Sequence, residues 1–308
     1  MTAFSTLRAG GLTWDALPLR LFDKGNAKFW NPRDLDFDQD AKDWAALSDE
    51  QRFVATMLCA QFAGGEESVT HEIQPFIAAM RAEGRFGDEL YLTQFCLEEA
   101  KHTQVFRLWL DAVGVDGDLH AHVENNPGYR AIFYDELPTA LGRLVDDPSP
   151  ENQVRASVVY NHVVEGVLAL TGYFVWNRAC RAHRILPGMQ QLIRHIGDDE
   201  RRHMAWGTFT CRRHVAADDR NWDVVKEQMH ALLPHAIAQI EWTTRQFDGD
   251  PFELRLGGVM DYAAGHAMRR LRAIEAARGM PVDRIDLDYS PERLEEEFRA
   301  EDEQALGD

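Results

Sequence analysis

The amino-acid sequence predicts an all-α protein in which additional helices surround a four-helix bundle. Three observations predict this class. Long apolar segments with helix-capping signals follow one another along the chain. No rhythm of short strands and turns separates them. An acidic and histidine motif also occurs twice in segments of helical length. We expect one domain over 1–308, with an N-terminal arm at 1–46, a bundle at 48–215 and additional helices at 218–308.

The arm is expected to be irregular, with at most a short helix. The first bundle helix is predicted over 49–81. Ser48-Asp-Glu-Gln51 has the residues of a capping box, which marks a helix start. Gly64-Gly65 and Pro75 lie inside the helix and reduce its stability, so they predict a kink or a close backbone approach near Glu66.

The other bundle helices are predicted from apolar periodicity and from glycine and proline stops. The second helix is apolar over most of its circumference, which is typical of a buried helix. The third follows Ser149-Pro150, an N-cap and first-turn pair. Its many valines would also suit a strand, but the length of the segment favours a helix. The predicted helices after the first are 86–113, a shorter one at 129–144, one from 150 past 170, 189–215, 218–247, 252–278 and one from Ser290.

Composition limits the function classes. The formal net charge of −18 argues against nucleic acid or an anionic membrane surface as a partner. The four cysteines form no Cys-x-x-Cys pair, which favours reduced thiols over disulfides or a zinc ribbon. We find no signal-peptide pattern and no apolar run of membrane-spanning length. The sequence therefore predicts a cytoplasmic protein.

The most informative motif is Glu98-Glu99-Ala-Lys-His102, which returns as Asp199-Glu200-Arg-Arg-His203. Positions i and i+3 of a helix share one face, so each copy presents a carboxylate and an imidazole together. Two such helices, with one glutamate from each of two others, form the dinuclear metal site of a four-helix bundle. Glu66 and Glu165 are the single glutamates, each at a similar distance before its motif.

The predicted metal ligands are four carboxylates and two imidazoles from four helices. This set suits iron or manganese, and the absence of a thiolate disfavours structural zinc. For Glu165 alone, an internal salt bridge to an arginine is an equal alternative, since a buried carboxylate needs some partner. The predicted ligands are Glu66, Glu99, His102, Glu165, Glu200 and His203.

Neighbouring acidic and histidine residues have weaker assignments. Asp199 is a candidate to orient His102 across the bundle, because a ligand histidine usually donates its other N–H to a carboxylate. For Glu98, a solvated acidic surface is the favoured interpretation. His162 and His71 also lie near the motifs, but a hydrogen-bonded or surface histidine is favoured for each. A third match, Glu227-x-x-His230, lacks an apolar setting and is interpreted as chance.

These residues resemble the ferritin-like carboxylate proteins that include the ribonucleotide reductase small subunit. Within that superfamily, the chain closely resembles the small-subunit-like ligand-binding oxidases of actinobacteria and other microbes. The resemblance covers essentially the whole chain. The matching segments are Asn26-Ala-Lys-Phe-Trp30, Gly65-Glu-Glu-Ser-Val-Thr70, Tyr91-Leu-Thr-Gln-Phe95, Glu98 to Phe106, Tyr160-Asn-His-Val-Val-Glu-Gly166, Leu186-Pro-Gly-Met189 and Gly197 to Gly207.

The resemblance implies an oxygen-activating oxidase with a mixed manganese/iron cofactor. It places manganese at Glu66, Glu99 and His102 and iron at Glu165, Glu200 and His203, with Glu99 bridging; a di-iron cofactor is the alternative. It also implies a long-chain fatty acid at the metals, a homodimer, and an ether bond between Val69 and Tyr160. Spacing alone would leave both of these last residues as core.

Two rivals to this function are a ribonucleotide reductase radical subunit and an iron-storage protein. Against the first, Glu66 stands where typical reductase subunits have Asp. Phe106 occupies the place of the usual radical tyrosine, and no aromatic residue follows Phe298. Storage would require many iron atoms per chain. The sequence therefore favours an oxidase whose natural substrate it does not identify.

Overall fold

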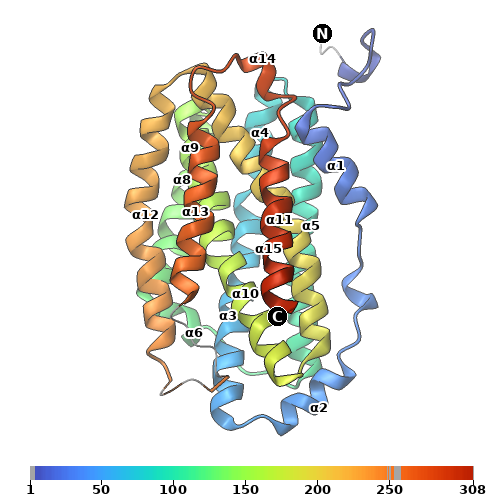
Figure 1. Ribbon diagram of the computed structural model, residues 1–308, viewed down its shortest axis with the longest axis vertical. Coiled ribbons are helices and arrows are strands. Elements are labelled where there is room, and N and C mark those ends of the chain that lie inside the picture. Colours follow the sequence, from blue (N-terminus) through green and yellow to red (C-terminus); the bar gives the residue numbers. More distant parts are fainter. Residues whose placement is uncertain (1–3, 248, 250, 253–257, 308) are drawn as a thin grey trace.

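The computed structural model describes residues 4–247, 249, 251–252 and 258–307, and every regular element among these residues is helical. Most helices run along the long axis of the molecule (Figure 1). The predicted all-α class is confirmed. Four helical stretches carry the predicted ligands: α3 (Asp49–Glu72), α5 (Phe86–Ala112), the continuous run of α9 (Pro150–Ser157), η4 (Val158–Ala169) and α10 (Leu170–His183), and α11 (Pro187–Ala217).

The first bundle helix starts where its capping box predicts but ends earlier than expected. The Ser48 hydroxyl accepts from the Gln51 backbone N–H, and the Gln51 side chain accepts from the Ser48 N–H. Near Glu66, where the sequence predicts a kink or a close backbone approach, α3 continues past Glu66 to Glu72, and the break lies at Ile73, before α4 (Gln74–Ala82). Pro75 explains the position, since proline suits the first turn of a new helix and not the interior of an old one.

Gly64 and Gly65 provide the close approach that the sequence indicates. A Cβ on Gly64 would lie 2.7 Å from the Tyr129 hydroxyl oxygen, and one on Gly65 would lie 3.4 Å from the Phe133 ring. Tyr129 donates from this hydroxyl to the Gln61 carbonyl at 3.2 Å. The two glycines thus admit the helix of α7 (Pro127–Tyr129), η3 (Arg130–Glu136) and α8 (Leu137–Asp146), which fills the predicted 129–144 segment.

The N-terminal arm is more ordered than predicted. It contains two helices, α1 (Leu17–Ala27) and α2 (Asp38–Ala46), and two short 3-10 turns, η1 (Ser5–Leu7) and η2 (Pro32–Asp34). Asp40 on α2 is fully buried and accepts from the Gly188 and Met189 backbone N–H groups at 2.7 and 2.8 Å. The arm therefore caps the N-terminus of α11, an anion-binding end of the helix.

A π-helical stretch, η4, interrupts the third bundle helix and contains Glu165. A second one, η3, precedes α8. Neither was predicted, because apolar periodicity does not distinguish the wider turn from an α-helical one. π-helical turns are rare and are frequently found at functional sites. The helix start after Ser149 is confirmed, although the Ser149 side chain makes no capping bond.

The remaining helices cover the bundle. They are α6 (Ala121–Glu124), α12 (Arg220–Thr244), α13 (Val259–Glu275), α14 (Val282–Ile285) and α15 (Ser290–Gly307). α12 and α13 both pack against η4, and α15 packs against α11 and α13. These helices match the predicted 218–247, 252–278 and post-290 segments except at their ends; residues 253–257 of the second segment and residue 308 of the third lie outside the described residues.

The core consists of two apolar clusters with a polar layer between them. On α3, one cluster reaches Cys59 and the other begins at Val69. On α5, the boundary falls between Phe95 and Val105. The predicted ligands of both helices lie in these gaps. A layer of charged side chains thus crosses the middle of the molecule, where desolvation makes unpaired charge costly.

The helical run Pro150–His183 is long and apolar enough, by composition, to cross a membrane, which corrects the expectation that no such run exists. Within its most apolar window, 72% is buried inside the protein. The same run carries Glu165 in the polar layer. Its apolar surface is therefore covered by neighbouring helices.

Candidate metal centre

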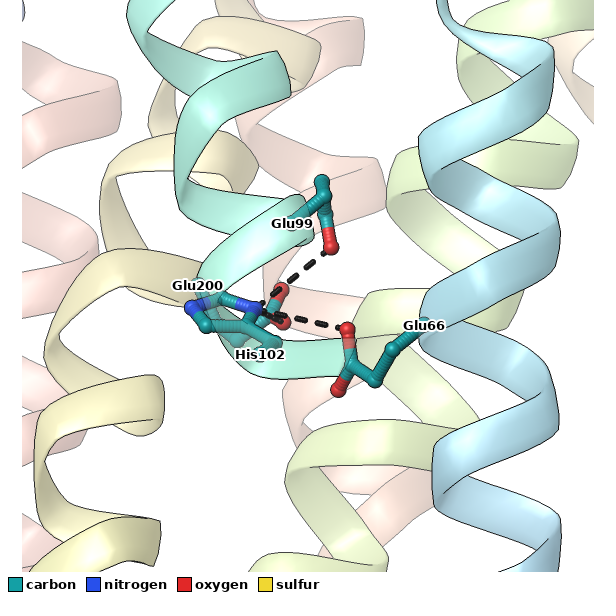
Figure 2. Close-up of side chains that lie close together, drawn as sticks. All are labelled: Glu66, Glu99, His102 and Glu200. Atoms are coloured by element: carbon teal, nitrogen blue, oxygen red, sulfur yellow. Dashed lines mark hydrogen bonds and ion pairs between the residues drawn. The ribbon is translucent and has the colours of Figure 1, made fainter. Parts of the chain in front are cut away.

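The structure brings all six predicted ligands together in the polar layer. They form two overlapping groups in which one ligand atom per residue lies within 4.8 Å of the others. Figure 2 shows the first group, in which side chains from three different helices converge. The groups share Glu99 and Glu200. The first group is Glu66, Glu99, His102 and Glu200, and the second is Glu99, Glu165, Glu200 and His203.

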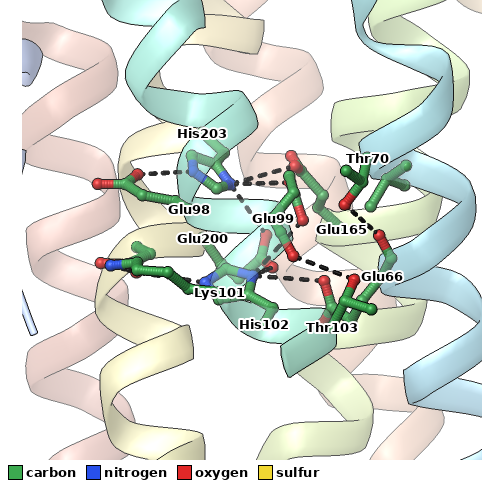
Figure 3. A network of polar contacts seen from close by, with 12 residues as sticks. Glu66, Thr70, Glu98, Glu99, Lys101, His102, Thr103, Glu165, Glu200 and His203 are labelled. Carbon is green, nitrogen blue, oxygen red and sulfur yellow. Dashed lines mark hydrogen bonds and ion pairs between the residues drawn. The ribbon is translucent and has the colours of Figure 1, made fainter. Parts of the chain in front are cut away.

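Each histidine faces three carboxylates through its Nδ1 atom. His102 Nδ1 lies 3.3 Å from Glu66, 3.5 Å from Glu99 and 3.5 Å from Glu200. His203 Nδ1 lies 3.3 Å from Glu99, 3.4 Å from Glu165 and 3.5 Å from Glu200. Figure 3 shows His203 above His102, with Glu99, Glu165 and Glu66 on the right of the two histidines. The two histidines thus have equivalent surroundings, one set of three carboxylates for the histidine of each motif.

The donor atoms fit a pair of metal ions. Among the described residues, one oxygen each of Glu99, Glu165 and Glu200 is buried without a hydrogen-bond partner, and so is Nδ1 of His203. Buried polar atoms are nearly always paired, so these orphaned atoms point to a missing partner. Two divalent cations would also balance the charge of four carboxylates. Carboxylate and imidazole ligands suit manganese and iron.

Burial and crowding shift the protonation of the cluster. Burial raises the pKa of Glu66 to about 8 and also raises the pKa of Glu165 and Glu200, and the neighbouring carboxylates add to each shift. Burial alone would raise the pKa of Glu99 too, but the close His102 and His203 imidazoles lower it overall. Without metal, the cluster therefore holds protons among its carboxylates at neutral pH.

Each histidine is oriented by a carboxylate from the opposite motif. His102 Nε2 lies 3.2 Å from Asp199, as the sequence predicts. His203 Nε2 lies 2.9 Å from Glu98. The expectation that Glu98 is solvated is wrong, because its side chain is only 3% exposed. The acidic residue before each predicted ligand glutamate thus lies within hydrogen-bond distance of the histidine in the other helix, where it can fix the histidine tautomer.

Three more side chains hold these two carboxylates in place. Arg202 donates to Glu98 at 2.7 Å and to Asp199 at 2.5 Å. Trp30 donates from its indole to Asp199 at 2.8 Å, and Lys101 lies over the Trp30 ring. A buried charge is tolerated only when it is paired and hydrogen-bonded, and this network meets that condition.

The other histidines lie outside the two ligand groups. His162 is buried on η4 and contributes to neither group. His71 is exposed near the end of α3. Glu227 and His230 of the third motif are both exposed on α12. Their interpretation as structural or surface residues agrees with these positions.

Two tyrosines border the cluster. The Tyr160 hydroxyl lies 3.1 Å from the Val69 carbonyl oxygen and 3.2 Å from a Glu99 carboxylate oxygen. Spacing alone did not establish that Tyr160 and Val69 meet, and the structure places them in contact. Tyr173 donates to Glu66 and was not predicted. Tyr173 lies eight residues after Glu165 and belongs to neither of the motifs from which the metal ligands were predicted.

Asn161 was also missed. It donates to the second Glu165 oxygen at 2.9 Å and accepts from the Ser157 hydroxyl at 3.0 Å. Its position four residues before Glu165 was the available signal, because such residues share a helix face. The bond fixes one carboxylate oxygen and leaves the other turned toward His203.

A mainly apolar cavity of about 150 Å³ reaches the cluster. Four of the six predicted ligands line it, namely Glu66, Glu99, Glu165 and Glu200. Its other walls include Leu58, Phe62, Val69, Phe133, Val164 and Leu168. An apolar pocket with a few polar groups at one end is the usual form of a small-molecule site.

Comparison with known proteins identifies the family. The family described as "Ribonucleotide reductase, small chain" matches residues 18–277. Among solved structures, the chain is 33% identical to the R2-like ligand-binding oxidase from Sulfolobus acidocaldarius, with a TM-score of 0.84. The match covers 92% of this chain and 98% of that one.

Further similar structures are variants of an R2-like ligand-binding oxidase with a reconstituted Mn/Fe cofactor. A glycine-to-phenylalanine variant, reconstituted anaerobically, is 35% identical and has a TM-score of 0.81 over 89% of this chain and 98% of that one. A tyrosine-to-phenylalanine variant, reconstituted aerobically, is 34% identical with a TM-score of 0.79 over 90% and 98%. The chain therefore belongs to the ribonucleotide reductase small-chain family, and within it to the R2-like ligand-binding oxidases.

Proposed function

We propose that this protein is an oxygen-activating oxidase with one manganese and one iron ion. Glu66, Glu99 and His102 would hold manganese, and Glu165, Glu200 and His203 would hold iron. The observation that carries the proposal is the pair of overlapping ligand groups that share Glu99 and Glu200. The Mn/Fe cofactor of the similar oxidases supports this choice of metals, and a di-iron pair is the alternative.

A bound metal pair supplies redox equivalents for the reduction of dioxygen. The protein contributes the arrangement around it. Asp199 and Glu98 hold His102 and His203 with Nδ1 turned toward the carboxylates. Tyr173 and Asn161 each fix one carboxylate oxygen, of Glu66 and Glu165 respectively. The apolar walls of the cavity exclude water from the reacting groups.

The test is anaerobic reconstitution with both metals, followed by metal analysis and anomalous diffraction at the manganese and iron edges. One ion of each metal per chain, at the assigned positions, is the expected result. Two irons would establish the di-iron alternative. Many irons per chain would favour storage, and no bound metal would overturn the proposal.

We propose that the cavity binds a long-chain fatty acid or a similar amphiphile, with the carboxylate at the metals. Four ligand glutamates at one end and apolar walls elsewhere support this assignment. Denaturing extraction followed by lipid mass spectrometry is expected to release a fatty acid. Recovery of none from several expression hosts would argue against this ligand.

We also propose that oxygen exposure joins Tyr160 to Val69 through an ether bond. A C–O bond would form as Val69 loses a C–H hydrogen and Tyr160 its phenolic hydrogen, so two electrons and two protons pass to dioxygen. The contact of the Tyr160 hydroxyl with Glu99 and with residue 69 supports this. Val69→Ala is expected to abolish the link and to retain both metals. Peptide mapping that finds only separate peptides in aerobic, metal-loaded protein would refute it.

A radical subunit of ribonucleotide reductase remains the second candidate, because the family match itself favours it. Phe106, in the place of the usual radical tyrosine, is fully buried and stacks on Phe62 at 5.5 Å. An aromatic ring without a hydroxyl cannot form a tyrosyl radical. Nucleotide reduction after addition of a large subunit would establish this second candidate.

We propose, finally, that the chain forms a homodimer in the cytoplasm. All four cysteines lie in the described residues and carry free thiols, which supports a reducing compartment. Light scattering is expected to give twice the 35.1 kDa chain mass. A monomer, or recovery of the native protein from an extracytoplasmic fraction, would contradict this assignment.

A further inference from the structure

Arg270 on α13 links the C-terminal helix to the helix that carries Glu165. Its side chain is 1% exposed. Nε and Nη2 donate to the two Glu295 oxygens on α15, at 2.6 and 2.8 Å. Nη1 donates to the Gly166 carbonyl oxygen at 3.3 Å. One guanidinium therefore bridges α15 and the peptide directly after a predicted metal ligand.

Gly166 is required for this approach. A Cβ at this position would lie 2.9 Å from the Met204 side chain and 3.3 Å from Arg270 Nη1. Distances this short force the neighbouring side chains to move. An added methyl group would also lie 3.1 Å from the Asn161 carbonyl oxygen, so glycine leaves the space through which Arg270 reaches this backbone.

The segment that receives the bond is π-helical. Such turns are rare, and a rare backbone conformation persists only where its surroundings hold it. Asn161 holds the Glu165 carboxylate from within the segment. Arg270 holds the backbone from outside it. Glu295 forms a bidentate ion pair with the Arg270 guanidinium. This pair fixes the orientation of the guanidinium.

We propose that Arg270 is a positioning residue for Glu165, and that through it the C-terminal helix α15 controls the metal position formed by Glu165, Glu200 and His203. This inference rests on the proposed two-metal function. Within the described part of the chain, Arg270 donates hydrogen bonds to η4 and α15 alone. Glu66 and His102 lie on α3 and α5, so loss of Arg270 acts on one metal position more than on the other.

The experiment compares Arg270→Gln with Arg269→Gln. Arg269 precedes Arg270 on α13, but it pairs with Glu297 and Glu301, both exposed. Anaerobic iron titration against a competing chelator is expected to show about 10-fold weaker binding at the Glu165 position in Arg270→Gln, the usual effect of removing a group that orients a ligand. Arg269→Gln is expected to match the parent. The Mössbauer spectrum of bound iron should change only in the Arg270 variant.

Two further variants keep the test independent of folding. Glu295→Gln retains the Arg270 cation but weakens the ion pair that holds it. Gly166→Ala leaves the charges unchanged and crowds Nη1 together with Met204 and the Asn161 carbonyl oxygen. Both are expected to weaken the same metal position, and Arg270→Lys to restore part of the affinity. Thermal unfolding of each metal-free variant separates this effect from a general loss of stability.

Parent-like iron affinity in Arg270→Gln and Gly166→Ala, or equal weakening at both metal positions, would overturn the inference. These results are distinct from failure of the proposed function, in which the parent protein itself binds no metal pair.

Discussion

At the scale of single residues, His102 and His203 divide their two ring nitrogens between different tasks. Nδ1 faces three carboxylates, and Nε2 meets Asp199 or Glu98. A ligand histidine held in this way needs no rearrangement when a metal binds. Its orientation therefore depends on residues that touch no metal.

Replacing Asp199 by Asn is expected to weaken metal binding at the His102 position by about 10- to 100-fold, because the carboxylate no longer fixes the tautomer. Glu98→Gln should weaken metal binding at the His203 position in the same way. Anaerobic competition titration measures both affinities. Unchanged affinity in both variants would show that the crossed hydrogen bonds have no role in binding.

Glu200→Ala is expected to weaken both metal positions, because Glu200 belongs to both ligand groups. The loss should exceed the roughly 10- to 100-fold effect of removing an orienting carboxylate. Metal analysis after reconstitution gives the content per chain. Glu227→Ala, at an exposed glutamate of the third motif, is the control. Full retention of both metals in Glu200→Ala would show that Glu200 is not a ligand.

The six cluster residues could be predicted because a repeated motif and helix periodicity place them on shared faces. Tyr173 could not, because its contact with Glu66 depends on how two helices cross. Glu98 was misassigned for a related reason. A helix pattern shows which face a side chain occupies, but not that Arg202 and His203 from another helix cover that face.

At the scale of helices, Gly128 shows how closely the covering helices approach. A Cβ at this position would lie 2.2 Å from the Gln239 backbone nitrogen and 2.3 Å from the His235 carbonyl oxygen on α12. Backbone atoms cannot move aside as a flexible side chain can. The contact of α7 with α12 therefore requires glycine.

Gly128→Ala is expected to lower the free energy of unfolding by about 3 kcal/mol or more, since the α12 backbone must shift to admit a methyl group. Gly142→Ala is the matched control. Gly142 lies within α8, is exposed, and has no atom within 4 Å of the added Cβ. This change should raise stability by up to about 1 kcal/mol through helix propensity. Urea unfolding measures both, and equal stabilities would contradict the predicted clash.

Two buried histidines predict a pH dependence. Burial and the Arg270 charge lower the pKa of His162 to about 3, and burial with Arg213 lowers the pKa of His214 well below its usual value. Unfolding restores a histidine pKa near 6.5. Below this pH the unfolded state therefore binds more protons than the folded state. The contribution of these two histidines to stability is therefore complete above pH 6.5 and is lost as pH drops, for His162 down to about pH 3.

Each histidine is expected to contribute up to about 1.4 kcal/mol of lost stability per pH unit below 6.5. Urea unfolding of metal-free protein above and below pH 6.5 measures this slope. His162→Gln should reduce it, whereas replacement of the exposed His230 should leave it unchanged. A slope in His162→Gln equal to that of the parent would refute the assignment.

At the scale of the whole molecule, the polar layer separates two apolar clusters that would otherwise form one core. Metal ions that bind only the folded state add stability by mass action. Removal of metal is expected to cost about 2.7 kcal/mol for each ion present at 100 times its Kd. Calorimetry of loaded and chelator-treated protein should show a lower melting temperature after metal removal. Equal melting temperatures would imply that the layer is stable without metal.

The sequence predicts the bundle better than the segments around it. Helices α5 and α11 have long apolar patterns with clear stops, so their extents were nearly right. The arm at 1–46 has short helices whose stability comes from packing on α5 and α11, which local sequence does not reveal. The break at Ile73 lies just before Pro75, which stands in the first turn of α4.

The crossed pairing of Asp199 with His102 and of Glu98 with His203 has a consequence for the origin of the chain. Each half contains a complete set of ligand types, but neither half contains the carboxylate that orients its own histidine. A half-length ancestor with one such unit would have oriented its histidine only by associating with a second copy. Fusion of two such copies would then place in one chain a site that a single copy could not have formed by itself.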